Sequence, residues 1–276
     1  MNPHAAHSIS PLQLWRSLSQ HRHLILQMSK REIIGRYKGS MLGVLWSFLA
    51  PLAMLLIFTF VFGEIFGAKW PGMENSGGLD FAAALFVGLV LYTFFSECLS
   101  RAPSLVISNV NYVKKVVFPL EILAVIALLA ALFHLLTAYV ILVLLILFSG
   151  WTLSWPILLL PLILLPFMLM ALGFTWWLSA LGVYLRDIAQ VIGPIMIAML
   201  FLSPVFYSLD SVPQKLLWIY HLNPLTFVIE EARNLLLYAN TPNWAGLALY
   251  SAISLPVFFL GYAFFQKTRK GFADVL

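Results

Sequence analysis

The sequence predicts an all-α integral membrane protein with six transmembrane helices. Hydrophobic residues make up 62% of the chain, and the 16 Lys and Arg and 11 Asp and Glu residues are confined to a few places. The 64 residues from 122 to 185 include no charged side chain. Soluble helices need a polar face, and about 20 apolar residues cross a bilayer core of roughly 30 Å. This uncharged run is therefore long enough for two crossings.

The apolar residues favour helices over a membrane β-barrel. They come in solid blocks such as Ile141–Phe148 and Ile157–Leu165, whereas barrel strands alternate apolar and polar residues. The turn between the two crossings of the uncharged run falls at residues 149–156, where Trp151 and Trp155 suit the headgroup zone.

Apolar runs bounded by charge, Gly or Pro define the spans in order. The expected spans are Met41–Phe62, Phe81–Leu99, Leu120–Phe148, Ile157–Tyr184, Ile188–Leu209 and Trp244–Phe265. A transmembrane domain over residues 41–265 thus lies between a segment at 1–40 and a tail at 266–276. The N-terminal segment lacks the apolar core and cleavage site of a signal peptide, so the first span is expected to be an uncleaved anchor.

The distribution of Lys and Arg predicts the orientation, because cytoplasmic loops are enriched in these residues. With both termini in the cytoplasm, only Lys69, Lys215 and Arg233 lie outside. The other 13 basic residues then lie inside: Arg16, Arg22, Lys30, Arg31, Arg36, Lys38, Arg101, Lys114, Lys115, Arg186, Lys267, Arg269 and Lys270. The sequence therefore predicts a multi-pass membrane protein with both termini in the cytoplasm, surrounded by membrane lipids.

Two further regions of the chain are expected to lie at or near the membrane interface. Leu12–Tyr37 mixes Leu, Trp and Ile with Arg and Lys and predicts an amphipathic interfacial helix. Leu216–Leu222 and Leu225–Tyr238, separated by Asn223-Pro224, are each too short to cross. They are expected to be re-entrant or interfacial helices before the last span.

Residues for catalysis, metal binding or nucleic-acid binding are scarce. The sequence has no phosphate-binding loop, no His-Glu-x-x-His motif and no Gly-x-Ser-x-Gly elbow. The single cysteine, Cys98, excludes an internal disulfide and offers no metal cluster. The basic residues flank apolar blocks rather than forming a groove for nucleic acid. We expect no catalytic residue, no metal and no nucleic-acid partner.

His134 is the one ionisable side chain well inside a predicted span. An ionisable group in lipid is a candidate functional residue. The alternative is a neutral imidazole that forms a hydrogen bond with a neighbouring helix, and the absence of a carboxylate or cysteine in the same span favours it.

Four motifs resemble the permeases of ABC-2 type polysaccharide exporters, a group that includes the O-antigen, capsule and teichoic-acid export families. They occur in order at Arg36–Trp46 (RYKGSMLGVLW), Asn111–Glu121 (NYVKKVVFPLE), Leu185–Ile188 (LRDI), and Ser203–Tyr207 (SPVFY) with Asn223–Leu225 (NPL). The resemblance extends over most of residues 32–265 and is closest to the O-antigen export permeases. It implies the six-helix ABC-2 exporter fold and a location in the bacterial inner membrane.

The resemblance also implies partners and site residues. It implies a homodimer with two separate ATPase chains, which would hold ATP and Mg, and a lipid-linked polysaccharide substrate moving along the dimer interface. Two cytoplasmic loops would then contact the ATPase. The residues it assigns to these loops are Asn111, Tyr112, Lys114, Lys115, Phe118, Arg186 and Asp187.

Phe58, Phe62 and Phe66 recur every four residues and would form one stripe on a helix. Because the C–H faces of sugars pack on aromatic rings, the stripe is a candidate lining for the polysaccharide path. Packing against lipid or other helices would explain it equally well.

Two other functions remain open. One is an ABC-2 exporter of drugs or small lipids. The other is a membrane-bound acyl- or glycosyltransferase with His134 at its active site.

Overall fold

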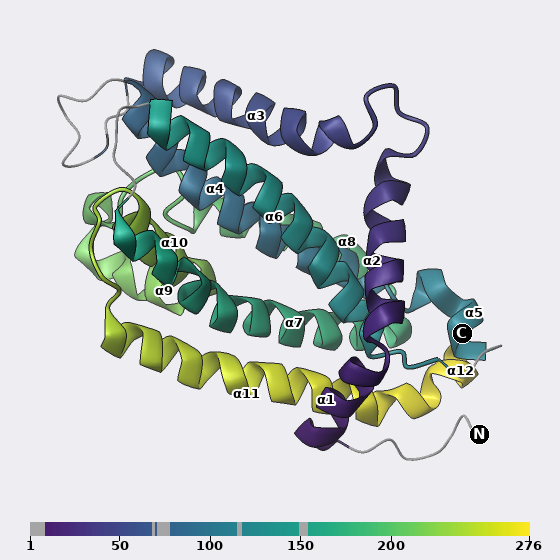
Figure 1. Ribbon diagram of the computed structural model, residues 1–276. Helices are drawn as coiled ribbons and strands as arrows, with labels where there is room; N and C mark the ends of the chain where they lie inside the picture. The colour runs from purple at the N-terminus through teal and green to yellow at the C-terminus, as the bar shows by residue number, and fades with distance from the viewer. Residues whose placement is uncertain (1–8, 68–69, 71–77, 115–117, 149–153) are drawn as a thin grey trace.

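The computed structural model describes residues 9–67, 70, 78–114, 118–148 and 154–276, and every secondary-structure element in these residues is a helix (Figure 1). The α-helices are α1 Pro11–Gln20, α2 Arg22–Tyr37, α3 Trp46–Phe58, α4 Gly78–Arg101, α5 Val110–Lys114, α6 Ile122–Phe148, α7 Leu160–Tyr184, α8 Ile188–Phe201, α9 Leu217–Leu222, α10 Pro224–Leu236, α11 Trp244–Thr268 and α12 Phe272–Val275. The all-α prediction is confirmed.

Five helical segments in the described residues are long and apolar enough to cross a membrane. They are Gly43–Ile65, Phe81–Ser104, Ile122–Phe148, Trp155–Tyr184 and Trp244–Val275. Each overlaps one of the predicted spans. The first segment contains α3 between a short 3-10 turn at Gly43–Leu45 and a π-helical stretch at Thr59–Ile65.

The chain runs back and forth between two ends of the molecule (Figure 1). One end, here called the α5 end, holds α5, α12 and the turn at residues 185–187. The opposite end, here called the α9 end, holds α9 and the turns at residues 202–216 and 237–243. The N-terminal helices α1 and α2 and the C-terminal helix α12 all lie toward the α5 end. This arrangement agrees with termini on one side of a membrane, although the side itself stays a prediction.

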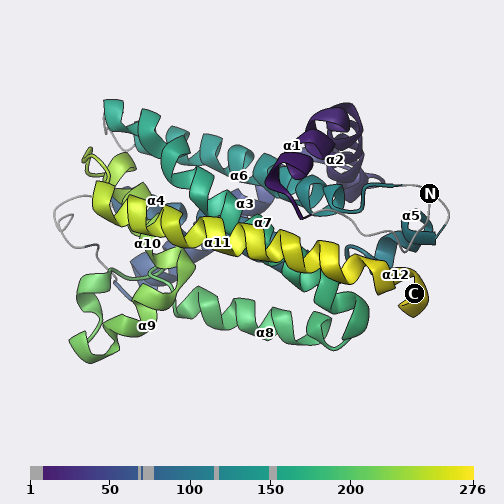
Figure 2. The ribbon, with the colours of Figure 1, turned by 90° about the horizontal axis from the view of Figure 1, so that it is seen from below.

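Helix α4 lies at the centre of the bundle. In its most apolar stretch 78% of the residues are buried, against 11% in the first span, which contains α3. It packs against α6, α7, α8 and α10, and Figure 2 shows α8 and α6 on opposite sides of the bundle. The first span therefore keeps most of its surface free for lipid or for another protein chain.

Helices α7 and α11 form the closest helix pair in the bundle. Their backbones meet at Gly173 and Gly261, where a Cβ atom added to Gly261 would lie 2.1 Å from the carbonyl oxygen of Gly173. Small residues allow such close approach between membrane helices. The two helices therefore pack as one unit.

The predicted fifth span is shorter than expected. Helix α8 ends at Phe201, so its 14 residues extend only about 21 Å, less than a bilayer core of about 30 Å. Pro204 lacks an N–H group and disfavours helical geometry at Ser203. The expected helix through Leu209 is wrong beyond Phe201, and the six-span count stays a prediction.

Side chains of the following segments satisfy the carbonyl groups that this break leaves free. Asn223 Nδ2 donates to the Leu202 carbonyl at 3.0 Å. Arg233 Nη1 donates to the Pro204 carbonyl at 2.6 Å, and its Nη2 donates to the Val205 carbonyl at 3.1 Å. A helix can end at membrane depth only where protein groups replace these bonds.

Arg233 belongs to the predicted outer segment Leu225–Tyr238, and its side chain is buried inside the bundle. It lies in α10 with 1% of its surface exposed. Its Nε donates to the Ala84 carbonyl at 2.9 Å, and Nη1 pairs with Glu230 at 2.9 Å. The guanidinium also lies 4.2 Å from the Trp70 ring centre. Burial lowers the pKa of Arg233 to about 10, so it remains charged at neutral pH.

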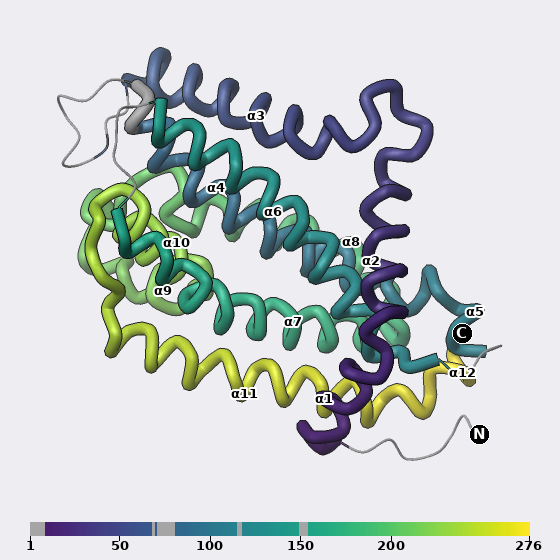
Figure 3. Tube along the Cα trace, in the orientation of Figure 1, coloured from purple at the N-terminus to yellow at the C-terminus, as the bar shows by residue number. Residues whose placement is uncertain are grey.

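The segments α9 and α10 are helices, as the sequence predicts, and α10 packs between α4 and α7 at the α9 end. The N-terminal segment forms two helices, α1 and α2, with a break at His21 instead of one continuous helix. Helix α2 crosses the end of α6, and the chain then turns sharply into the first span (Figure 3). An interfacial location for α1 and α2 stays a prediction.

Candidate functional site

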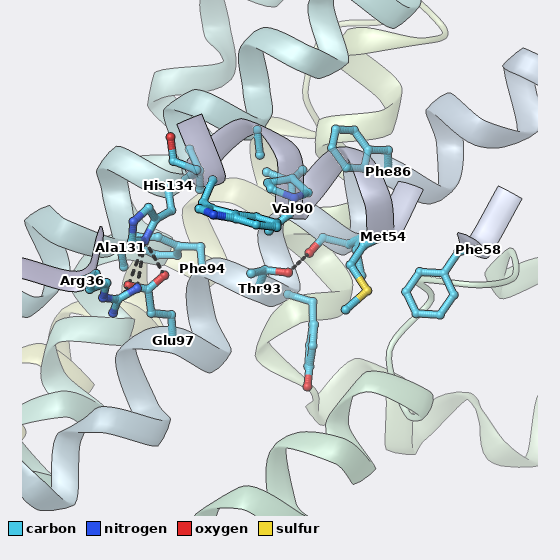
Figure 4. A pocket seen from close by; sticks show the side chains of 18 of the residues that line it. Arg36, Met54, Phe58, Phe86, Val90, Thr93, Phe94, Glu97, Ala131 and His134 are labelled. Atoms are coloured by element: carbon cyan, nitrogen blue, oxygen red, sulfur yellow. Dashed lines mark hydrogen bonds and ion pairs between the residues drawn. The ribbon is translucent and has the colours of Figure 1, made fainter. Parts of the chain in front are cut away.

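A groove of about 380 Å³ lies between α3, α4 and α6. Its walls are mainly apolar and include Met54, Phe86 and Val90 (Figure 4). Arg36, Glu97 and His134 gather at one end, and Phe58 lies at the other. The groove is therefore apolar along most of its length and has ionisable residues at one end.

The ionisable end is a cluster of four side chains from α2, α4 and α6. Arg36 Nη2 lies 2.6 Å from Glu97 Oε1, and His134 Nδ1 lies 2.9 Å from Glu97 Oε2. The Tyr37 hydroxyl lies 3.0 Å from His134 Nε2. The cluster attaches the C-terminal turn of α2 to the centre of the bundle.

The contacts give the direction of one hydrogen bond in this cluster. A carboxylate only accepts hydrogen bonds, so His134 Nδ1 donates to Glu97. Arg36 Nη1 also lies 3.1 Å from Nδ1, but both atoms are then donors, so this contact is not a hydrogen bond. Burial raises the pKa of the Tyr37 phenol, whose hydroxyl lies beside the second imidazole nitrogen, Nε2.

This geometry supports the structural interpretation of His134. The imidazole has a partner at each nitrogen, from Glu97 on a neighbouring helix and from Tyr37. Glu97 belongs to a different predicted span, so the residues around His134 in the sequence did not reveal this partner. Thr137 Oγ1 donates to the backbone carbonyl of His134 at 2.9 Å, so this hydroxyl contacts the main chain and not the imidazole. Within the described residues, no three His, Cys, Asp or Glu side chains come together as a metal site.

The three phenylalanines of the predicted stripe lie in a row along the C-terminal part of the first span. The ring centres of Phe58 and Phe62 are 6.3 Å apart, and those of Phe62 and Phe66 are 5.6 Å apart. Phe66 is 68% exposed. The Phe62 ring also stacks on Phe206 at 4.8 Å. Phe206 follows the broken end of α8, so the row continues onto a second segment.

The stripe coincides with the π-helical stretch Thr59–Ile65. The Phe66 N–H group donates to the Val61 carbonyl five residues earlier, at 3.0 Å. Single π-helical turns are uncommon and frequently occur at functional sites. Phe58, Phe62 and Phe66 form a row of contacting rings at the α9 end, and the buried Phe206 packs against Phe58 and Phe62.

The predicted ATPase-contact residues lie at the opposite end. Asn111 and Lys114 are exposed on α5, and Tyr112 is half-buried. Tyr112 stacks on Phe118, with ring centres 4.4 Å apart and an interplanar angle of 12°. Lys115 lies outside the described residues.

The second predicted contact loop lies at the same end. Arg186 and Asp187 are exposed in the turn between α7 and α8. Helix α12 contacts both α5 and α7, and Tyr184 contacts Phe272 of α12 at 6.0 Å between ring centres. The structure thus places both predicted loops at the α5 end, with α12 beside them.

Comparison with known proteins identifies the family of this chain. The model of the ABC-2 type transporter family matches residues 23–237. The chain belongs to the ABC-2 type transporter family. The predicted family is therefore confirmed, and the chain is a multi-pass membrane protein of a transporter family.

Several curated relatives of this ABC-2 chain match it over nearly the full length. It is 26% identical to the O-antigen export system permease protein RfbA of Myxococcus xanthus, over 95% of this chain and 99% of the relative. It is 26% identical to RfbA of Klebsiella pneumoniae, over 92% of this chain and 95% of the relative. It is also 26% identical to the polysialic acid transport protein KpsM of Escherichia coli, over 87% and 91%.

We expect Glu97→Gln to lower the free energy of unfolding of this ABC-2 chain by about 1–3 kcal/mol. The single amide oxygen cannot replace two carboxylate oxygens that accept from Arg36 and His134. Denaturant unfolding in detergent measures the change. Glu64→Gln is the matched control, because Glu64 is exposed and surface substitutions change stability by about 0.5 kcal/mol or less. Equal stability of the two variants would contradict the assigned contacts.

Proposed function

We propose that this chain is the permease subunit of an ATP-driven exporter that moves a lipid-linked polysaccharide, O-antigen, from the cytoplasmic side across the inner membrane. The observation that carries this proposal is the match to the ABC-2 family together with relatives over nearly the whole chain. Those relatives bear the names of polysaccharide export and transport proteins. We extend the function that these names state to this chain.

A separate ATPase is the proposed energy source. Residues 1–276 contain no phosphate-binding loop. The exposed residues Asn111, Lys114, Arg186 and Asp187 form the proposed contact surface at the α5 end. We propose two permease chains and two ATPase chains, with ATP and Mg in the latter.

The proposed polysaccharide path runs between two copies of this chain. The first span supports this location because it is the least covered of the five long helical segments in the described residues. Its aromatic stripe presents ring faces on which sugar C–H groups can pack. Weak and repeated contacts of this kind allow a polymer to slide without a deep binding well.

Capsular polysaccharide is the second candidate substrate. The similarity to KpsM, whose name states polysialic acid transport, favours it. Exported O-antigen is attached to lipopolysaccharide, whereas exported capsular polysaccharide is not. This attachment distinguishes the two substrates. The same cell-surface assay therefore separates them.

The direct test is complementation of a gene deletion. We expect cells without this chain to lose O-antigen from their surface and to regain it with the wild-type gene together with its ATPase partner. The purified chain should not hydrolyse ATP by itself. Surface polymer is measured by gel analysis of lipopolysaccharide and by capsule staining. Loss of capsule alone would select the second candidate, and normal polymer in the deletion strain or ATP turnover by the chain alone would contradict the proposal.

The proposed role of the aromatic stripe as the lining of the polysaccharide path can be tested by mutation. Replacing both Phe62 and Phe66 by Ala should reduce export about tenfold, because two aromatic contacts of about 0.5–1 kcal/mol each are lost. The readout is the rate at which polymer reaches the surface at equal permease level. Phe148→Ala with Phe259→Ala is the control, since both rings are exposed and neither belongs to the stripe. Equal export by the two double variants would identify the stripe as packing against lipid.

A further inference from the structure

A buried ion pair lies directly behind the first predicted contact loop. Arg269 Nη1 in the segment after α11 is 2.6 Å from Glu121 Oε2, and the two side chains are 12% and 7% exposed. Arg269 Nη2 donates to the Phe118 carbonyl at 2.7 Å. One planar guanidinium therefore holds both the last residue of the loop and the residue that precedes α6.

Glu121 connects this pair to two more helices. Ser17 Oγ of α1 donates to Glu121 Oε1 at 2.7 Å. The indole Nε1 of Trp176, in α7, donates to the Glu121 backbone carbonyl at 3.0 Å. Trp176 is fully buried. Four segments that are distant in sequence thus meet at Glu121: α1, the loop before α6, α7 and the end of α11.

Helix α5, the exposed part of the loop, is connected to Glu121 through a series of contacts. Tyr112 of α5 stacks on Phe118, and the Phe118 carbonyl is the group that Arg269 binds. A displacement of α5 therefore shifts Phe118, Arg269 and Glu121 together. Because a guanidinium fork constrains direction as well as distance, this contact transmits a displacement better than an apolar contact would.

The connection continues along α7 and α11. Trp176 packs against Phe258 and Tyr262 of α11, with ring centres 5.3 Å apart in both pairs. Farther along, Tyr250 of α11 donates to the Pro224 carbonyl at the start of α10, at 3.0 Å. Helices α7 and α11 thus join the α5 end to α10, whose Arg233 holds the segment that carries Phe206.

A role in stability alone is a weak explanation for this pair. Two charges lose their hydration on burial, and an apolar pair of similar volume is often at least as stabilising. We propose that Glu121 and Arg269 are positioning residues that transmit the movement of the ATPase-contact loop to α1, α7 and α11. This inference rests on the proposed function, because it requires an ATPase that moves α5.

The test measures how much polymer is exported for each ATP hydrolysed, by the assembled permease–ATPase complex in proteoliposomes. Arg269→Lys keeps the charge but cannot bind Glu121 and Phe118 with the same planar fork. We expect this ratio to fall about tenfold, the effect of losing one charge-assisted hydrogen bond, while basal ATP hydrolysis by the assembled complex stays close to the wild type. Tyr184→Phe is the control, because it removes a hydrogen bond to the neighbouring Thr268 carbonyl at the same end and should leave the ratio unchanged.

The outcomes separate this inference from the proposed function. A wild-type complex that hydrolyses ATP without exporting polymer would contradict the proposed function. A wild-type complex that exports, together with an Arg269→Lys complex of equal ratio, would overturn the inference alone. If Arg269→Lys does not assemble, Ser17→Ala removes only the link from α1 to Glu121. A ratio reduced about twofold to threefold in that variant would support the inference, and an unchanged ratio would overturn it.

Discussion

The bilayer offers no hydrogen bonds, so every interruption of a helix within it has to be satisfied by protein groups. The rest of this structure depends on that constraint. Helix α8 ends early, and its free carbonyls bind Asn223 and Arg233 from the segments that follow. The same arginine binds a carbonyl of α4. The break in α8 and the position of α10 are therefore parts of one arrangement, which also sets Phe206 against the aromatic stripe.

Four groups of ion-paired residues lie in the described part of the bundle. Arg101 pairs with Glu32 and joins α4 to α2. Arg233 and Glu230 stabilise the α9 end. Arg36, Glu97 and His134 attach α2 to α4 and α6 beside the groove. Glu121 and Arg269 join α1, α7 and α11 behind the predicted ATPase-contact loop. In each place the charge is paired and hydrogen-bonded, as burial in a medium of low dielectric constant requires.

Much of the fold could be predicted because the sequence features that determine it lie close together in the chain. The apolar runs located the five long helical segments, and the spacing of Phe58, Phe62 and Phe66 predicted their common face. The exposed positions of Asn111 and Arg186 agree with their proposed role at a partner surface.

The remaining features depend on contacts between residues far apart in the chain. The partner of His134 is Glu97, 37 positions away, and the partner of Glu121 is Arg269, 148 positions away. The burial of Arg233 could not be predicted, because most of its acceptors are backbone carbonyls, which a sequence pattern does not reveal. Ser203-Pro204 could have indicated the early end of α8. The apolar residues that continue to Leu209 instead suggested a longer span.

The central claim is that the α5 end faces an ATPase in the cytoplasm while the α9 end faces outward. Single cysteines at Asn240 and Lys270, introduced one at a time into a Cys98→Ala chain, test it most directly, because both positions are exposed and lie toward opposite ends. The account predicts that a membrane-impermeant maleimide added to intact spheroplasts labels the Asn240 position and reaches the Lys270 position only after lysis. Labelling at Lys270 before lysis would contradict it.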